Sequence, residues 1–272
     1  MIRKLCTVVL GMTLSGIASA DWALNMPKGV TELSSETYDI HMLIFWWCVG
    51  IAVVVFGAMI YSLIAHRKSR GVEPATFTHS MTAEVVWTTI PVIILLIMAI
   101  PSAELMIKLE DTRDPDLTIV ATGYQWKWHY NYQGEGVQFF STLSRDSQMA
   151  RRRGSGVDPS SVENYLLEVD KRLVVPKDAK VRLLLTSNDV VHAWWVPELA
   201  IKKDAIPGFV NETWFRAEQT GVYRGQCAEL CGMDHGYMPI VVEVVEPDAF
   251  QAWLDNEKGG LTPMADVNGE LK

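Results

Sequence analysis

Two long apolar segments dominate the first half of the chain. The first covers residues 42–65 without a charged side chain, and the second runs from about residue 85 to 103, with Pro91 and Pro101 inside it. At 1.5 Å per residue, each segment is long enough to cross a hydrocarbon core of about 30 Å. We therefore predict a transmembrane hairpin over residues 41–108, with helices at about 41–65 and 84–107 joined by a loop at 66–83.

The charges that flank these segments predict their orientation. The loop between them carries Arg67, Lys68 and Arg70 against the single acid Glu73, whereas the outer flanks are acidic. The positive-inside rule places such a loop in the cytoplasm. The short segment 21–40 and everything after the hairpin should then lie on the exported side, which is the periplasm if the membrane is a bacterial inner membrane.

The first 20 residues have the pattern of a cleavable secretory signal. Arg3 and Lys4 precede an apolar run that ends in the small residues Ala18, Ser19 and Ala20, as signal peptides do. An additional transmembrane anchor is the alternative, but the run is short for a span of the bilayer. Cleavage after Ala20 would remove two positive charges and change the formal net charge from -8 to -10.

From residue 117 the pattern changes to short β-rich runs separated by glycine and proline. The runs include LTIVATGY, VRLLLTS, GVYRGQC and PIVVEVVE, and no long helical pattern alternates with them. This pattern is typical of an all-β domain. We predict an antiparallel sandwich or Greek-key barrel over residues 109–257.

Three further segments of this half are predicted to lie at the surface. Residues 144–164 are polar, include Arg151, Arg152 and Arg153 in succession, and read as a solvent-exposed loop, with an anion site as the alternative. Residues 247–256 resemble a short surface helix. Residues 258–272 read as a flexible polar tail.

The net charge of the chain indicates which classes of partner it can bind. The chain has 272 residues and a formal net charge of -8. So acidic a protein is poorly suited to bind nucleic acid and well suited to dock a basic partner. The expected surroundings are therefore a lipid bilayer and other proteins.

The candidate chemistry lies between Tyr223 and Pro239. Cys227, Cys231, His235 and Met238 follow a C-x3-C-x3-H-x2-M spacing, and His192 follows an upstream strand. Sulfur and imidazole ligands together favour copper, whereas a zinc site has little reason to include methionine. Because exported proteins retain disulfides, a bond between the two cysteines is the other alternative.

Two cysteines four residues apart exceed what a mononuclear blue-copper site needs. Both thiolates could bridge two coppers, with His192 and His235 each binding one metal and Met238 acting as a weak ligand. The carbonyl of Glu229, between the cysteines, could complete the second copper. The pattern therefore predicts a dinuclear copper centre for electron transfer at one end of a cupredoxin-type sandwich.

With these residues in view, the chain resembles subunit II of the haem–copper cytochrome c oxidases. The resemblance covers nearly all of the predicted mature chain and includes the blocks EVVWTTIPVIIL, GYQWKWHYNY, SNDVVHAWWVPEL and GQCAELCGMDHGYMP. It implies a CuA centre that accepts electrons from cytochrome c and passes them to haem a in subunit I. Oxygen is reduced to water in subunit I, coupled to proton translocation, and subunit III is a further expected partner.

The same resemblance implies roles for individual residues outside the ligand set. Trp126 corresponds to the tryptophan at which electrons enter, and Asp170 and Asp189 correspond to acids that attract the basic cytochrome. The side chain of Glu229 would reach a magnesium or manganese ion at the interface with subunit I. Glu84 corresponds to an acid at the entrance of a proton channel, whereas the plainer alternative is an acid in a first helical turn capped by Thr82.

The chain departs from the family pattern at two positions. Lys127 stands where an aromatic residue is usual, and Asn188 stands where an acid is frequent, which puts the details of cytochrome docking in doubt. No C-x-x-C-H sequence is present, so we expect no covalently bound haem. A quinol-oxidase relative would lack the copper ligands, and a free-standing copper carrier would have no use for Glu84.

Overall fold

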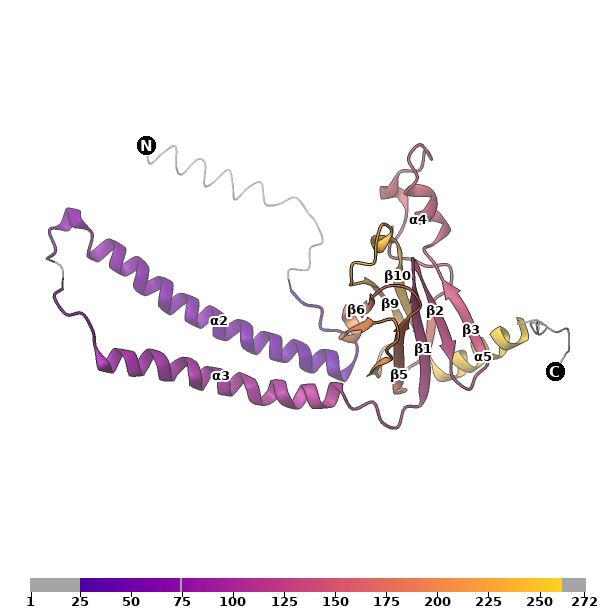
Figure 1. The fold of residues 1–272 in the computed structure, drawn as a ribbon, viewed down its shortest axis with the longest axis horizontal. Helices are drawn as coiled ribbons and strands as arrows, with labels where there is room; N and C mark the ends of the chain where they lie inside the picture. Colours follow the sequence, from indigo (N-terminus) through magenta and orange to yellow (C-terminus); the bar gives the residue numbers. More distant parts are fainter. Residues whose placement is uncertain (1–24, 74, 261–272) are drawn as a thin grey trace.

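The computed structural model describes residues 25–73 and 75–260. The predicted signal segment, residues 1–20, lies outside the described residues, as does most of the predicted tail. Two apolar helices are followed by a β-sandwich (Figure 1). The predicted fold class, a two-helix hairpin before an all-β cupredoxin-like domain, is confirmed in this outline.

The hairpin consists of α2 (Glu32–Ala65) and α3 (Met81–Leu109), which run side by side and project from the β-domain (Figure 1). The turn of 3-10 helix η1 (Lys68–Arg70) lies in the connection between them. Both helices are long and apolar enough, by length and composition, to cross a membrane. Their side chains are mostly exposed in the isolated chain, as expected of surfaces that contact lipid or partner subunits.

Both helices begin earlier than the hydropathy pattern predicted. α2 starts at Glu32 rather than residue 41, because Thr31 and Ser34 form a reciprocal capping box. α3 starts at Met81 rather than residue 84, and its N-cap is Ser80, not Thr82. Hydropathy locates the part of a helix that can lie in lipid, whereas the polar caps determine where the helix begins.

The β-domain is built from two five-stranded sheets. Their orders are β3-β2-β1-β5-β8 and β4-β10-β9-β6-β7. The strands are β1 (Leu117–Tyr124), β2 (Lys127–Tyr132), β3 (Val137–Ser141), β4 (Leu173–Pro176), β5 (Val181–Ser187), β6 (His192–Val196), β7 (Ile201–Ala205), β8 (Asn211–Phe215), β9 (Gly221–Cys227) and β10 (Pro239–Val245).

The sheets are mixed, which corrects the prediction of an antiparallel sandwich. β1 pairs with β5 in parallel, and β10 pairs with β4 in parallel, while the remaining neighbours are antiparallel. Alternating apolar residues predict which face of a strand is buried. They do not predict whether neighbouring strands pair in parallel or antiparallel.

Large aromatic side chains fill the space between the sheets. Trp128, Tyr130 and Tyr132 on β2 are essentially inaccessible to solvent, and Trp194 on β6 joins them. The Tyr132 hydroxyl donates to the carbonyl of Val174 at 2.7 Å and accepts from its N–H at 3.0 Å, which ties β2 to β4. The indole N–H of Trp194 donates to the Tyr130 hydroxyl at 3.3 Å. The polar groups of Tyr130, Tyr132 and Trp194 are thus paired across the core, whereas the indole N–H of the buried Trp128 has no hydrogen-bond partner among the described residues.

Two segments predicted to be surface elements are more closely integrated. The segment 144–164 contains α4 (Arg145–Ala150) and the 3-10 turn η2 (Pro159–Ser161), and its Ser147 is fully buried. The final helix α5 (Pro247–Gly260) buries Phe250 and Leu254 against the core. This helix continues through residue 258, where the predicted tail began.

A short N-terminal segment, the strap (residues 27–31), ties the start of α2 to the β-domain. The Val30 N–H donates to the carbonyl of Glu198 at 3.0 Å, and its carbonyl accepts from the N–H of Glu218 at 2.9 Å. At the other helix, the Trp214 indole donates to the carbonyl of Lys108 at 3.0 Å. The hairpin and the domain are therefore joined at two places.

Candidate metal centre

Two neighbouring strands bring the predicted ligands to one end of the sandwich. β6 begins at His192, and β9 ends at Cys227, with Trp194 opposite Cys227 in the antiparallel pairing. The chain then continues through the metal loop (residues 228–238), which contains the short 3-10 turn η4 (His235–Tyr237) and leads into β10. Residues that are far apart in the sequence thus meet where the strands end.

The side chains in this region form a compact group of soft donor atoms. The Sγ atoms of Cys227 and Cys231 lie 3.9 Å apart. Nδ1 of His192 is 3.8 Å from the first sulfur, and Nδ1 of His235 is 3.5 Å from the second. The Met238 sulfur is 3.6 Å from Cys231 Sγ, and the carbonyl oxygen of Glu229 is 3.4 Å from Cys227 Sγ.

Burial and bonding of these groups fit a soft-metal site. His192, Cys227, Cys231 and Met238 are buried, His235 is half-buried, and the Glu229 side chain is exposed. Both cysteines are free thiols rather than a disulfide. The ligand atoms of His192, Cys227 and Cys231 all lie within 4.8 Å of one another, close enough to hold a metal ion. Two sulfurs, two imidazoles and a thioether in a largely buried pocket are the donors that copper prefers.

The protonation of the two thiols supports the need for a cation. Burial opposes ionisation of Cys227, but hydrogen bonds to the His192 imidazole and to the backbone of Ala193 and Glu229 together outweigh it, so the pKa of Cys227 is lowered. Burial and the neighbouring Cys227 raise the pKa of Cys231 to about 12. Two adjacent thiolates repel each other, and a positive ion bound between them would favour the deprotonated form of both.

Asp189 holds His192 in its orientation. The Asp189 carboxylate is 2.9 Å from Nε2 of His192, which leaves Nδ1 facing Cys227. The same carboxylate accepts the backbone N–H of Gln125 and that of Val190, each at 2.7 Å. Although burial disfavours the charged form, the bonds from His192 and the backbone lower the pKa of Asp189. A carboxylate that fixes a ligand histidine in this way is a common support of metal sites.

Gly123 on β1 provides the space that His192 occupies. A Cβ at position 123 would lie 2.7 Å from Cδ2 of His192. The sequence analysis did not single out Gly123. A lone glycine inside a strand is a usable signal of such a close approach.

Trp126 contacts the metal loop directly. Its indole N–H donates to the carbonyl of Cys231 at 3.2 Å, and the amide of Gln125 donates to the same oxygen at 2.9 Å. Gly232 has a φ of +116°, and a Cβ there would lie 3.2 Å from both side chains. Gln125 and Gly232 were not predicted as site residues, and Gln125 carries no sequence signal that would have marked it.

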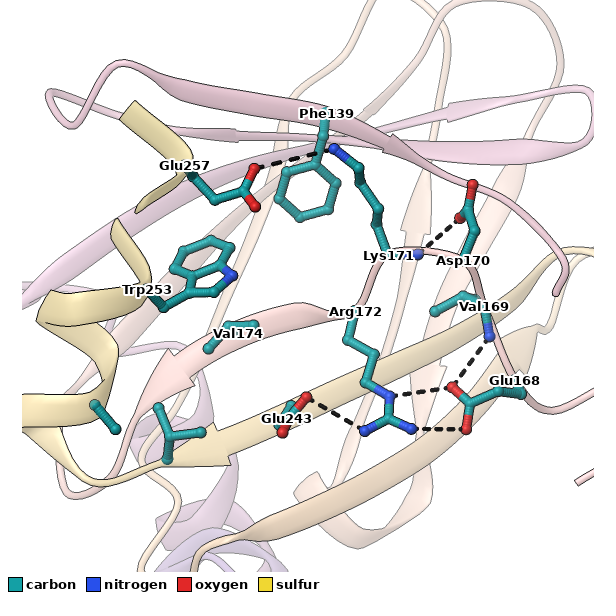
Figure 2. A pocket seen from close by; sticks show the side chains of 12 residues that line it. Phe139, Glu168, Val169, Asp170, Lys171, Arg172, Val174, Glu243, Trp253 and Glu257 are labelled. Carbon is teal, nitrogen blue, oxygen red and sulfur yellow. Dashed lines mark hydrogen bonds and ion pairs between the residues drawn. The ribbon is translucent and has the colours of Figure 1, made fainter. Parts of the chain in front are cut away.

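Asp170 lies away from the ligand group, beside a cavity of about 520 Å³ (Figure 2). Its carboxylate accepts the N–H of Thr142 at 2.7 Å and that of Lys171 at 2.8 Å. On the other side of the cavity, Arg172 bonds to Glu168 and Glu243 (Figure 2). Acids outnumber bases around this cavity, because Glu168, Asp170, Glu243 and Glu257 face only Lys171 and Arg172. Asp170 itself is exposed and anchors a turn.

The remaining predicted residues are spread over the molecule. Glu84 is in the first turn of α3, at the end of the hairpin far from the β-domain (Figure 1). Lys127 lies over the Phe140 ring at 4.2 Å, next to Trp126 in sequence. Asn188 accompanies Asp189 at the end of β5, and its N–H donates to the carbonyl of Gly123 at 3.0 Å.

Comparisons with known proteins agree with this architecture. Residues 117–245 match the family described as cytochrome C oxidase subunit II, periplasmic domain, and residues 19–105 match its transmembrane domain. The chain is 38% identical to a probable cytochrome c oxidase subunit 2 of Rickettsia bellii over 86% of this chain and 83% of that protein. It is 35% identical to cytochrome c oxidase subunit 2 of Cereibacter sphaeroides, over 81% and 78% of the two chains.

A solved structure is also similar in sequence. The periplasmic domain of subunit II of cytochrome oxidase from Bradyrhizobium japonicum is 40% identical and has a TM-score of 0.48. The comparison covers 56% of this chain and 99% of that domain.

Proposed function

The chain belongs to the cytochrome c oxidase subunit II family, so it is a membrane-associated component of an oxidoreductase complex, and we propose that it is the subunit through which electrons enter. Electrons would come from cytochrome c and pass to haem a in subunit I, where oxygen is reduced to water with proton translocation. The chain itself would carry electrons and would not bind oxygen.

The observation that carries this proposal is the convergence of four further donor groups on two cysteine sulfurs that lie 3.9 Å apart. We propose that they bind two copper ions as a CuA centre, with the ligands Cys227, Cys231, His192, His235, Met238 and the Glu229 carbonyl. The bound copper pair would supply one-electron chemistry with little change in geometry. The protein would keep both thiolates together, fix His192 through Asp189 and exclude water by burial.

Trp126 is the proposed point at which electrons enter. It is half-buried, and its N–H bonds the backbone of the ligand residue Cys231. We expect Trp126→Phe to slow reduction of the centre by cytochrome c because this link is removed, with the copper signal unchanged. Stopped-flow reduction of the purified oxidase measures this rate. Trp195→Phe, on β6, is a control, and an unchanged reduction rate for Trp126→Phe would refute the assignment.

The two acids proposed to attract a basic cytochrome contribute in different ways. Asp170 is exposed, so its charge adds to the field that the donor meets. The Asp189 side chain is only 28% exposed and is shared with His192, so its main role in this proposal is to support the ligand. Lys127 adds a positive charge near Trp126, which would restrict how a basic donor approaches.

Two acids are proposed to act at the interface with subunit I. The exposed side chain of Glu229 is free to reach a magnesium or manganese ion shared with that subunit. Glu84, in the first turn of α3, would lie at the entrance of a proton channel. Acids at membrane depth are costly and are usually kept for function.

The proposed setting is a bacterial inner membrane, with the loop between the helices in the cytoplasm. The N-terminal segment and the β-domain would lie in the periplasm after removal of residues 1–20. Subunit I, subunit III and lipid would cover the apolar sides of α2 and α3, which are exposed in the isolated chain.

Copper titration of the full chain in detergent tests the proposed function. We expect two coppers per chain and a mixed-valence signal in which one electron is shared by both ions. A single copper with a blue-copper spectrum would refute the dinuclear centre. Purification of the native complex separates this function from that of a copper carrier, because a carrier would be isolated without a haem-bearing partner.

A further inference from the structure

The metal loop is weakly supported by its own backbone. It leaves Leu230 and Met233 at 79% and 84% exposure, and it includes Gly232 and Gly236. The N–H of Tyr237 donates to the carbonyl of Asp234 at 2.9 Å, and the N–H of His235 donates to that of Gly232 at 3.3 Å. These local bonds shape the second half of the loop. The first half is tied to the domain by the N–H of Ala228, which donates to the carbonyl of Ala193, and by the Cys231 carbonyl, which accepts from Gln125 and Trp126.

Arg151, from the segment between β3 and β4, contacts this loop at two side chains. Its Nη2 lies 2.9 Å from Oδ2 of Asp234, and both side chains are only about a quarter exposed, at 25% and 24%. The guanidinium carbon also lies 4.1 Å from the ring centroid of Tyr237. Asp234 directly precedes the proposed ligand His235, and Tyr237 directly precedes the proposed ligand Met238.

The segment that carries Arg151 is itself fixed to the domain. Arg151 caps the C-terminus of α4, and its N–H donates to the carbonyl of Ser147 at 3.0 Å. The buried Ser147 hydroxyl accepts the N–H of Leu166 at 3.1 Å, and the N–H of Ser144 donates to the carbonyl of Glu168 at 2.9 Å. The guanidinium therefore extends from a rigid base rather than from a free loop.

We propose that Arg151 is a positioning residue that clamps the metal loop and holds His235 and Met238 at the copper centre. The proposal rests on the proposed copper function, because it assigns a support to that site. The ion pair holds the residue before one ligand, and the stacked ring holds the residue before the other. Sub-ångström placement of ligands depends on such supporting contacts.

Arginine suits this position better than lysine would. Its planar guanidinium can lie over an aromatic ring and donate in its plane to a carboxylate at the same time. A lysine ammonium is a point charge that keeps the ion pair but loses the flat stacking surface. We therefore expect Arg151→Ala to loosen the metal loop most and Arg151→Lys to loosen it less, relative to the native protein.

The test compares Arg151→Ala, Arg151→Lys and the control Arg152→Ala in the full chain, loaded with copper and purified in detergent. Arg152 is exposed, and within residues 25–73 and 75–260 it makes no ion pair. The measurements are the rate of copper release to a chelator, the mixed-valence signal, and the unfolding midpoint of the metal-free protein. Arg151→Ala removes a partly buried ion pair and a cation–π contact, and the loss of both is expected to make copper release about tenfold faster.

The expected result is faster release and an altered mixed-valence signal in Arg151→Ala, a smaller change in Arg151→Lys, and native behaviour in Arg152→Ala. In an Asp234→Asn background, Arg151→Ala should add less than it does alone. Release and signal identical to those of Arg152→Ala would overturn the clamp. So would a faster release explained wholly by a lower unfolding midpoint of the metal-free protein.

Failure of the clamp and failure of the copper function give different results. If the native chain and Arg152→Ala bind no copper, the proposed function fails. If both bind two coppers and Arg151→Ala does too with unchanged release, the clamp alone fails. If Arg151→Ala does not accumulate, copper release from Arg151→Lys is compared with that from Arg152→Ala, and equal release in these two variants would overturn the clamp.

Discussion

Gly225→Ala is expected to abolish correct folding of the β-domain. Gly225 lies on β9, beside the backbone of Trp195 and Val196 on the neighbouring strand β6. A Cβ at this position would lie 2.9 Å from Cα of Val196 and still closer to the Trp195 carbonyl. The neighbouring atoms are backbone, so they cannot rotate away as a side chain would. We expect a loss of more than about 4 kcal/mol in the free energy of unfolding, which is close to the whole stability of many domains.

Near-ultraviolet circular dichroism and copper uptake of the purified full chain measure this outcome. Gly57→Ala on α2 is a suitable control because it lies outside the β-domain, a Cβ at that position has open space and the backbone φ is not positive. Native circular dichroism and copper uptake in Gly225→Ala would show that β6 and β9 can separate at little cost, which would contradict the prediction.

Asp189→Ala is expected to weaken copper binding by about 10- to 100-fold, the usual effect of removing the partner of a ligand histidine. Without this carboxylate, His192 is no longer held with Nδ1 toward Cys227, and the N–H groups of Gln125 and Val190 lose their acceptor. Competition with a chelator measures the affinity. Asp189→Asn retains an acceptor oxygen and should lose less.

Asp248→Ala is the matched control because this exposed acid lies in the first turn of α5, outside the strands and the loop that carry the proposed ligands. If Asp189 acted only by attracting the electron donor, Asp189→Ala would keep native copper affinity and change only the salt dependence of the reaction rate. That pattern would contradict the supporting role described above.

The hairpin and the set of site residues could be predicted from the sequence because they depend on local patterns. Uninterrupted apolar residues identify the membrane helices, and five residues with soft side chains identify the metal site. The contribution of His192 was also readable, since the end of one strand and the following loop meet at the same edge of a sandwich. In the structure the ligand atoms of His192, Cys227 and Cys231 lie within 4.8 Å of one another, whereas their role as copper ligands stays a prediction.

The starts of the helices and the pairing of the strands could not be read in the same way. The helix that begins at Glu32 includes residues too polar for lipid, and only the cap at Thr31 defines its start. Parallel pairing of β1 with β5 depends on how the chain crosses between sheets, which alternation of apolar residues does not encode.

Contacts between distant charges were the least predictable feature. The run beginning at Arg151 looked like solvated charge, yet one of its members reaches Asp234, which is 83 positions away. Asp189 looked like a surface acid, yet its carboxylate is bonded to His192, a proposed copper ligand. From sequence alone a charged residue is expected to be exposed to solvent, because most charged residues are. Its partner becomes visible only in the folded chain.

The strap determines how freely the β-domain can turn relative to the membrane. A domain joined to its anchor by α3 alone could swivel about that connection, but the bonds of Val30 to Glu198 and Glu218 add a second attachment beside α2. Two attachments restrict rotation about the membrane normal and fix the height of the metal loop above the bilayer. Because electron tunnelling weakens steeply with separation, this restriction would keep the distance from the copper site to its acceptor nearly constant from one turnover to the next.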